Sequence, residues 1–389
     1  MGKTWGWFGC SVLEVTVSIE NTRLVRALDW CWATALFVAM AVVHILFLVR
    51  MLPSGFTLSE ALTQWDVAHY VDIARYGYFR QDSYSVPTVD VYEKRLAFFP
   101  GLPGLMWLLH TVTGMEVHTA GWLLTFGFGV FMTVGMIRLA QRLDFSRGGQ
   151  ILAVLLLLGA PMAVTFNMIY TEAPFIGLSL WALVAMLDRR WVLTGILVFL
   201  AGIFRLTAID LVFAFAVVVA IYARKNWVAW VSVALSATSV IAYLFYASSF
   251  TKDIGGYFGL QKKGWNSAFD FGAATAKWVY VQLTEFTYLG YELSMLSIFG
   301  ALIAVALAFR RLPWALWVFG SAIVANVVLS DGIMHSRPRL LLPAIILLLP
   351  VVAALIKAPK WTQIAVAAGY VAFGAWFSAY MLAIFEWAI

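Results

Sequence analysis

The sequence predicts an all-α polytopic membrane protein. Hydrophobic residues make up 63% of the 389 residues and charged residues only 12%, and the mean hydropathy is +0.87. Since a soluble domain carries about 25% charged residues, this composition excludes a soluble enzyme. The apolar residues also fall into long runs, many of which end at short basic connectors. Runs of about 20 apolar residues can cross a bilayer as helices.

Eleven apolar runs are interpreted as membrane-spanning helices. They occupy residues 27–49, 117–137, 150–169, 174–187, 191–204, 207–222, 227–248, 293–309, 313–329, 340–356 and 361–387. The apolar stretch at 100–115 is shorter than the about 20 residues that a span needs. We interpret it as a helix that lies in the membrane interface or re-enters it. The chain as a whole, residues 1–389, is taken as a single membrane domain.

The short basic connectors set the expected orientation. With the N-terminus in the cytoplasm, all of them lie on the cytoplasmic side, where positive charge is retained. These connectors are 138–147, 189–190, 224–225, 310–311 and 357–360. Two long polar segments, 50–116 and 250–291, then form outer loops. The net charge of +6 comes without a basic tract or nucleic-acid motif, so we expect membrane lipids as partners and no nucleic acid. The compact chain favours a bacterial plasma membrane.

The first outer loop is expected to contain one amphipathic helix. Thr57 and Glu60 have the spacing of a capping box at its start, and Gly77 is a natural stop at its end. Residues three and four apart share a helix face. One face therefore carries Asp66, His69, Tyr70 and Ile73. Asp72 lies off this face and is expected to pair with Arg75.

Asp66 is the candidate catalytic residue of that helix. An isolated aspartate in a loop is usually a solvated carboxylate, but here Trp65, His69 and Tyr70 surround it. We predict that His69 and Tyr70 bind substrate. A metal site is not predicted, because no HxxxH or HxH pair accompanies His69 and the five histidines are scattered.

Glu172 follows Tyr170 and Thr171 at the outer end of a predicted span. The carboxylate can simply reach water from this boundary or cap the helix that begins near Pro174. Alternatively, Tyr170 and Glu172 bind substrate on the side where Asp66 is expected.

Arg205 interrupts about 30 apolar residues. An arginine inside a membrane segment costs about 2.5–3.5 kcal/mol, so such residues usually face a cavity or a partner. A short outer turn that reaches water, or an ion pair with Asp210, are the alternatives to a functional role. On the outer side its guanidinium group could bind a phosphate through two hydrogen bonds.

Two further groups of residues complete the candidate site. Arg337 and Arg339 flank Pro338 at an outer boundary, with His335 just before them. Either the arginines anchor lipid headgroups, or they form a phosphate site. The second outer loop provides Tyr257, Gln261 and Trp265. Their segment is either an interfacial amphipathic helix or a surface that stacks on sugars and binds their hydroxyl groups.

Several of these segments resemble the PIG-V-like mannosyltransferases, which are membrane glycosyltransferases of the GT-C class. The similarity is carried by WDVAHYVDIA at 65–74, GY at 77–78 and AFFPGLP at 97–103, followed in the same order by YTE at 170–172, FRLT at 204–207 and RPRLLLP at 337–343. It extends over roughly residues 60 to 350. Asp66 matches the catalytic aspartate of that family.

The resemblance implies a GT-C-like fold with interfacial helices in both outer loops. It also implies an inverting transferase that moves a sugar, expected to be mannose, from a polyprenyl-phosphate donor to a lipid-linked or glycan acceptor hydroxyl on the outer face. Asp66 would accept the hydroxyl proton, and Arg205, Arg337 or Arg339 would stabilise the leaving phosphate. A monophosphate leaving group has little need of a bridging cation, so we expect no cofactor and no obligatory metal.

Two other classes of function make different predictions for the sequence. A flippase or transporter of lipid-linked sugars predicts polar residues at all membrane depths and broken helices in paired halves. The polar residues here gather on one side, and the sequence shows no paired halves. A structural scaffold leaves Arg205 and the segment around Asp66 unexplained.

Overall fold

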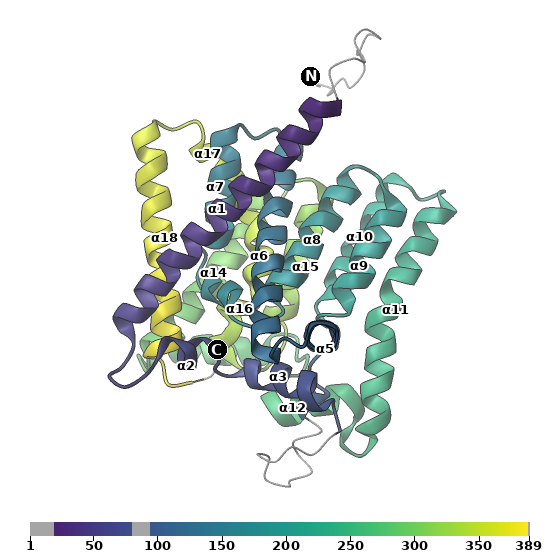
Figure 1. Ribbon diagram of the computed structural model, residues 1–389, viewed down its shortest axis with the longest axis vertical. Helices are drawn as coiled ribbons and strands as arrows, with labels where there is room; N and C mark the ends of the chain where they lie inside the picture. Colours follow the sequence, from purple (N-terminus) through teal and green to yellow (C-terminus); the bar gives the residue numbers. More distant parts are fainter. Residues whose placement is uncertain (1–18, 80–93, 388–389) are drawn as a thin grey trace.

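The computed structural model describes residues 19–79 and 94–387, with side chains from residue 27 onward. Part of the first outer loop, residues 80–93, therefore lies outside the described residues. Within the described ranges the chain is helical, and the only extended pairing is an isolated antiparallel bridge between Phe269 and Ser330. The long helices stand side by side as a bundle (Figure 1).

The bundle consists of regular helices and two broken segments. The regular helices are α1 (Ile19–Met51), α6 (Val117–Arg142), α7 (Arg147–Leu158), α8 (Glu172–Leu187), α9 (Trp191–Gly202), α10 (Ala208–Tyr222), α11 (Trp227–Phe250), α14 (Leu289–Ala308), α15 (Trp314–Val328) and α18 (Lys360–Ala383). One broken segment contains η1 (Ala163–Asn167), and the other contains η3 (Met334–Ser336), α16 (Arg337–Leu340), η4 (Leu342–Leu348) and α17 (Leu349–Leu355).

The predicted membrane segments are confirmed as apolar helices. In the described part of the chain, α1 from Ala27, α6, α11, α14 and α18 are long and apolar enough to cross a membrane. The stretch from Met334 to Leu355 passes the same test as one span with a 60° bend. Five shorter apolar helices, α7 to α10 and α15, complete the set. Each of the eleven predicted positions overlaps one of these segments, although among the described residues only the five long helices and the bent segment are long enough to cross a membrane.

A second group of helices covers one end of the bundle. They are α2 (Leu58–Leu62), α3 (Asp66–Tyr76), α5 (Gly101–Thr113), η2 (Lys252–Ile254), α12 (Gly256–Trp265) and α13 (Ala273–Thr284). Figure 1 shows α2, α3 and α12 at the lower edge and views α5 end-on, so that α5 lies across the bundle. The stretch at 100–115 is therefore a helix at the end of the bundle, as predicted, and both loops provide covering helices.

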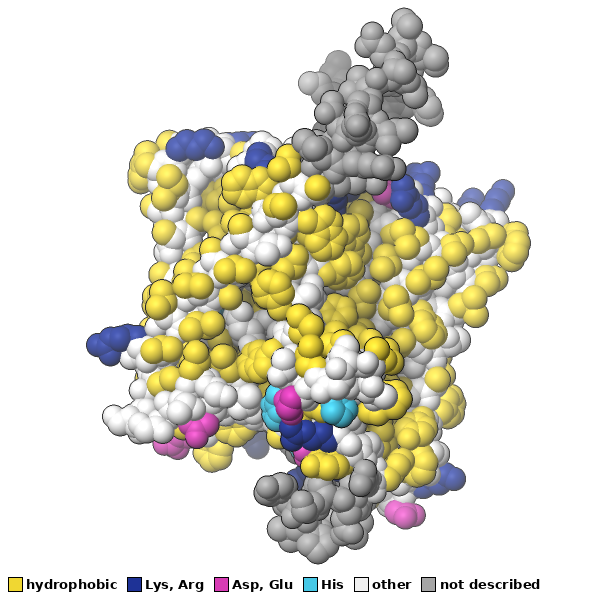
Figure 2. Space-filling view, viewed as in Figure 1, with side chains coloured by type: hydrophobic (Ala, Val, Ile, Leu, Met, Phe, Trp, Pro, Cys, Tyr) yellow, Lys and Arg dark blue, Asp and Glu magenta, His cyan; other side chains and the backbone are white. Residues whose placement is uncertain are grey.

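Charged residues are distributed unequally between the two ends. Figure 2 shows a broad apolar band, with lysine and arginine side chains along the edge opposite α3. The connectors between α8 and α9, between α10 and α11 and between α17 and α18 lie at that opposite edge (Figure 1). Around α3, acidic, basic and histidine side chains are mixed (Figure 2). The basic connectors thus share one end, as the sequence predicts.

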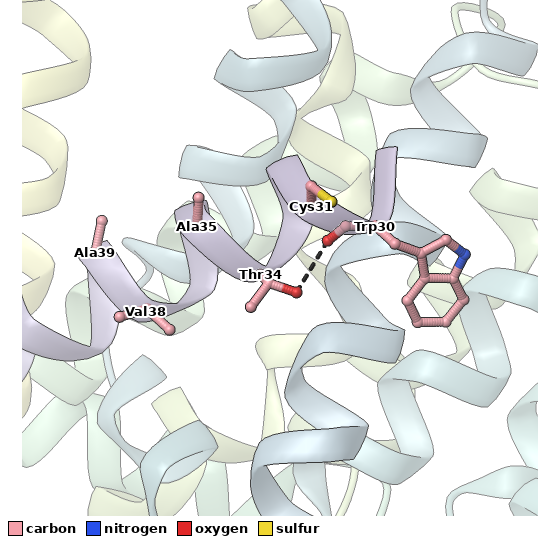
Figure 3. Close-up of a pocket in the computed structure, with 6 residues that line it drawn as sticks. All are labelled: Trp30, Cys31, Thr34, Ala35, Val38 and Ala39. Carbon is pink, nitrogen blue, oxygen red and sulfur yellow. Dashed lines mark hydrogen bonds between the residues drawn. The ribbon is translucent and has the colours of Figure 1, made fainter. Parts of the chain in front are cut away.

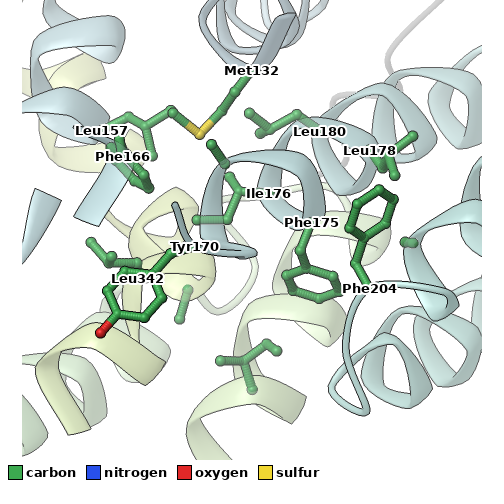
Figure 4. Packing of buried hydrophobic residues seen from close by; sticks show 14 of the residues in the cluster. Met132, Leu157, Phe166, Tyr170, Phe175, Ile176, Leu178, Leu180, Phe204 and Leu342 are labelled. Carbon is green, nitrogen blue, oxygen red and sulfur yellow. The ribbon is translucent and has the colours of Figure 1, made fainter. Parts of the chain in front are cut away.

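Helix α8 lies in the core of the bundle. Nearly all of its residues are buried, and it packs most extensively against α6 and α9. A helix that is apolar on every side must be surrounded by other helices, and this explains why α8 lacks a polar face. Figure 4 shows Phe175, Ile176 and Leu178 of α8 packed among residues of the neighbouring segments. Glu172, the first residue of α8, is therefore held by a rigid element.

The third predicted span, 150–169, is wrong in its second half. Helix α7 ends at Leu158, and Gly159 is its C-cap. The chain then turns through Pro161, whose ring disfavours a continuing helix. Backbone carbonyls freed at membrane depth need partners. His44 in α1 hydrogen-bonds the Leu158 carbonyl at 2.9 Å, and Tyr370 in α18 donates to the carbonyl of Leu156 at 2.9 Å.

Replacing Gly374 in α18 with alanine should destabilise the fold. A Cβ atom at this position would lie 1.9 Å from the carbonyl oxygen of Gly159, which is backbone and cannot rotate away. We expect a loss of about 1–3 kcal/mol, because forced overpacking displaces the two segments. The matched change Gly369→Ala, in the same helix, meets nothing within 4 Å and should leave stability unchanged or slightly raised. Denaturation by SDS in mixed micelles measures both, and equal stability of the two variants would contradict this contact.

Candidate active site

Asp66 is the first residue of α3. Thr57 and Glu60 form the predicted capping box, but it starts the short helix α2. Thr63, whose hydroxyl bonds back to α2 carbonyls, ends that helix. The chain then turns at Trp65, which has a φ of 59°. The predicted continuous helix is therefore wrong. The turn places the Asp66 carboxylate at a helix N-terminus, where the backbone dipoles favour an anion.

The broken segment after α7 brings Tyr170, Thr171 and Glu172 to α3. The hydroxyl of Tyr170 accepts a hydrogen bond from the backbone N–H of Asp66 at 3.3 Å. The hydroxyl groups of Tyr70 and Thr171 are hydrogen-bonded at 3.2 Å. In Figure 4 the Tyr170 hydroxyl points away from the other labelled side chains. An irregular stretch can place three consecutive residues where a straight helix would separate them.

Two arginines and two carboxylates form a chain of ion pairs. Arg339 donates to Asp66 Oδ2 at 2.8 Å, and Arg205 contacts Glu172 Oε1 at 2.6 Å. Arg339 Nε lies 3.6 Å from the same Glu172 oxygen and joins the two pairs. The Glu172 side chain is 3% exposed, whereas that of Asp66 is 21% exposed. The four residues, predicted separately from the sequence, thus share one partly accessible cluster.

Neighbouring side chains fix the two guanidinium groups. Arg339 lies over the ring of Tyr170, with its Cζ atom 5.1 Å from the ring centroid. Arg205 also donates to the hydroxyl of Thr171 at 3.4 Å. The alternative pairing of Arg205 with Asp210 does not occur, because Asp210 instead accepts a hydrogen bond from Asn326 at 3.1 Å.

Arg337 and His335 lie outside this cluster. Arg337 is buried and donates to the backbone carbonyls of Val327 and, at 2.6 Å, Ser330. His335 stacks on Tyr291, with ring centroids 5.7 Å apart. Of the two arginines around Pro338, Arg339 contacts Asp66, and Arg337 holds the end of α15.

His69 faces an aromatic group beside Asp66. Its ring stacks on Phe98 at a centroid distance of 4.7 Å, and Phe98 contacts the edge of Trp265 at 5.8 Å. Burial lowers the pKa of His69 below its usual value, and the carboxylates of Asp66 and Asp72 offset this effect only in part. His69 is therefore uncharged at neutral pH. Trp265 of α12 thus contacts the segment that contains Phe98.

Tyr257 and Gln261 lie behind these rings on α12. The amide of Gln261 donates to the Tyr257 hydroxyl at 3.0 Å, and that hydroxyl donates to the carbonyl of Ala97 at 3.3 Å. Tyr257 is buried. Both residues therefore contact the segment that contains Phe98, and neither touches the charged cluster through a hydrogen bond.

Two tyrosines that the sequence reasoning missed hold the same segment. The hydroxyl of Tyr243 in α11 lies 2.6 Å from the carbonyl of Phe98 and 3.0 Å from that of Leu96. Tyr78 also donates to the Phe98 carbonyl, at 2.8 Å. No local signal reveals the role of Tyr243, because a tyrosine near the end of an apolar run is typical of any membrane helix. Tyr78 is noticeable only as part of the GY segment at 77–78. Phe98 is thus fixed through its backbone.

The predicted pairing of Asp72 with Arg75 is wrong. Asp72 instead lies 3.4 Å from Arg95, whose side chain is only 1% exposed. A buried guanidinium group needs a counter-charge close by. Arg75 is half-exposed, so water can solvate its charge and its need for a partner is smaller. Arg75 pairs with Glu116 at the start of α6, and this contact joins α3 to the bundle.

A shallow apolar groove occurs elsewhere on the surface. Trp30, Cys31, Thr34, Ala35, Val38 and Ala39 line it (Figure 3). All six belong to the middle part of α1, where they recur at helical spacing. Its apolar lining suits contact with lipid. Among the described residues, no cluster of three or more His, Cys, Asp or Glu has the arrangement of a metal site.

Comparisons with known proteins identify the fold. No protein-family profile and no curated protein sequence matches the chain. It is similar to two crystal structures of ArnT from Cupriavidus metallidurans. The structure bound to undecaprenyl phosphate aligns with a TM-score of 0.52 and 17% identity over 88% of this chain and 69% of that chain. The apo structure aligns with a TM-score of 0.53 and 17% identity over 90% of this chain and 63% of that chain. The protein is therefore a predominantly helical integral membrane protein with the GT-C fold.

Proposed function

We propose that the protein is an inverting glycosyltransferase that uses a polyprenyl-phosphate sugar as donor. One observation carries this proposal: Asp66, at the end of the bundle covered by α3 and α12, contacts Arg339 at 2.8 Å within a cluster that also contains Arg205. This combination provides a base and a phosphate site. The ArnT structure bound to undecaprenyl phosphate is consistent with a lipid-phosphate donor. Mannose as the sugar and a place in the PIG-V-like family depend on the sequence resemblance.

The proposed reaction is a single displacement. The acceptor hydroxyl transfers its proton to Asp66 as its oxygen forms a bond to the anomeric carbon. The bond between that carbon and the phosphate oxygen breaks, and the phosphate leaves with the electron pair. Arg205 and Arg339 stabilise the negative charge that the phosphate gains. Attack opposite to the leaving group inverts the anomeric configuration. Because the guanidinium groups supply this positive charge, the proposal includes no cofactor and no obligatory metal.

The proposal places the site on the outer face of a bacterial plasma membrane. The basic connectors lie at the opposite end of the bundle, which would make that end cytoplasmic. The isoprenoid tail of the donor would lie between membrane helices. A glycolipid or glycan acceptor would approach from the side of His69 and Trp265, where rings can stack on sugars.

Transport of a lipid-linked sugar is the second candidate function. Transporters often contain broken helices, and the segments around η1 and α16 are both broken. However, both lead to residues that contact the Asp66 cluster near one end of the bundle. A transporter is expected to place its site near the midplane instead.

A transfer assay distinguishes the two functions. The purified protein is incubated with radiolabelled polyprenyl-phosphate mannose and a membrane lipid extract, and the labelled products are identified. We expect label in a new glycosidic bond of inverted configuration, insensitive to EDTA. A parallel donor carrying glucose tests the sugar. Translocation of the intact donor across liposomes, with no glycosidic bond formed, would replace the transferase proposal with the transporter.

A further inference from the structure

The four charges of the cluster balance one another, and Asp66 is held by Arg339 in a way that conflicts with its proposed role as a base. Arg205, Arg339, Asp66 and Glu172 carry two positive and two negative charges that neutralise one another. Arg339 donates a hydrogen bond to Asp66 Oδ2 at 2.8 Å and so occupies one of the oxygens that would take the proton. This contact must break before that oxygen can accept a proton from the acceptor.

We propose that the donor phosphate displaces Asp66 from Arg339 and so activates it as the base. The inference rests on the proposed function and adds a binding order to it: the polyprenyl phosphate binds first, to Arg339 and Arg205. Asp66 is then released toward the acceptor hydroxyl. Glu172 stays in place and holds both guanidinium groups.

The hydrogen bonds of Arg339 support this exchange. A guanidinium group has five N–H donors, and among the described residues Arg339 donates a single hydrogen bond, to Asp66. Its Nε atom is buried without a hydrogen-bond partner in that part of the chain, and so is Glu172 Oε2. Buried polar atoms are normally paired. Arg339 therefore has several donors left for an anion.

The position of Arg205 allows both arginines to bind one phosphate. Arg205 and Arg339 contact the same oxygen, Glu172 Oε1, at 2.6 and 3.6 Å. Two positive groups this close repel each other, and Glu172 is the group that compensates them. A phosphate that accepts a hydrogen bond from Arg205 and another from Arg339 would add further negative charge between the two guanidinium groups.

Burial indicates which carboxylate gives way. The Glu172 side chain is 3% exposed at the start of the buried helix α8, and that of Asp66 is 21% exposed. Asp66 also follows the turn at Trp65 at the edge of the bundle, so a rotation of its side chain requires little repacking. The ion pair that a ligand can replace is therefore the one between Asp66 and Arg339.

Binding of the phosphate alone tests the exchange without any transfer. The probe is undecaprenyl phosphate, titrated calorimetrically against the full-length protein in nanodiscs. Removing the competing charge with Asp66→Asn should lower the Kd by roughly 10-fold, equivalent to about 1.4 kcal/mol. The control Asp72→Asn removes a carboxylate that pairs with Arg95 on the same helix and should leave the Kd unchanged. An unchanged or higher Kd in Asp66→Asn would overturn the exchange, whether or not the protein transfers sugar.

The same substitution made in an Arg339→Gln variant distinguishes displacement of Asp66 from Arg339 from simple repulsion between Asp66 and the phosphate. In Arg339→Gln the Kd should rise, and adding Asp66→Asn should then bring no gain, because the shared partner is absent. A gain of the same size in both backgrounds would overturn the proposal. Phosphatidic acid is titrated in parallel, and equal binding of that lipid would overturn the assignment to a polyprenyl carrier.

A structure of the wild-type complex provides a test that needs no variant. With undecaprenyl phosphate bound, the distance between Arg339 and Asp66 should exceed the 4.0 Å limit of an ion pair, while the contact between Arg205 and Glu172 remains. An Asp66–Arg339 pair that persists at 2.8 Å beside bound phosphate would overturn the exchange.

Discussion

Asp66→Asn should reduce sugar transfer by about 10²–10⁴-fold, the range that a general base contributes. The amide keeps the size of the side chain but cannot take the proton of the acceptor hydroxyl. The variant should remain folded, because an amide oxygen can still accept hydrogen bonds where the carboxylate does. Initial rates with a radiolabelled donor measure the effect, and size-exclusion chromatography checks the fold.

Asp72→Asn is the matched control for this loss. It makes the same chemical change on the same helix, at a residue that lies 3.4 Å from Arg95 and is absent from the ion-pair chain. We expect it to retain most activity. If Asp66→Asn turned over at a rate near that of Asp72→Asn, Asp66 would not be the base.

Glu172→Ala should have the largest effect on stability. The change leaves Arg205 and Arg339 close together without the carboxylate they share. Removing one partner from a buried ion pair costs about 3–5 kcal/mol. SDS denaturation in mixed micelles measures this loss, and Glu172→Gln should lose less because it keeps a hydrogen-bond acceptor.

Asp188→Ala, at the other end of α8, is the corresponding control. Asp188 pairs at 2.9 Å with Arg142, whose side chain is 53% exposed. Exposed pairs contribute about 0–1 kcal/mol, so the variant should be nearly as stable as the wild type. Losses of similar size in the two variants would show that Glu172 does not compensate buried charge.

The sequence predicts the membrane segments well because each depends on local composition. It also identifies Asp66, Glu172, Arg205 and Arg339 as separate candidates, since charged residues beside apolar runs are costly and noticeable. Their pairing could not be predicted, because it depends on which segments meet. The spacing favours pairing of Asp72 with its sequence neighbour Arg75, whereas in the structure Asp72 pairs with the distant and more deeply buried Arg95.

The two arginines around Pro338 illustrate the same limit. They fall on the short helix α16, where residues two apart point to nearly opposite sides. One therefore reaches Asp66 and the other reaches the carbonyls at the end of α15. From the sequence, both arginines have the same two interpretations, as headgroup anchors or as phosphate ligands, because a single helical turn gives no periodic signal. The break after α7 does have a local signal, because Gly159 and Pro161 both disfavour a continuing helix. The residues around them are apolar, however, and the run therefore has the composition of an unbroken span.

The way this break is closed has a consequence for biogenesis. Tyr370 and Gly374 of α18, which is synthesised long after α7, contact the residues at which α7 stops. The break therefore gains these neighbours only after α18 has been made and inserted. A nascent chain in which residues 360–383 have not yet been made lacks the hydrogen bond and the close packing that fix the end of α7 ahead of Glu172.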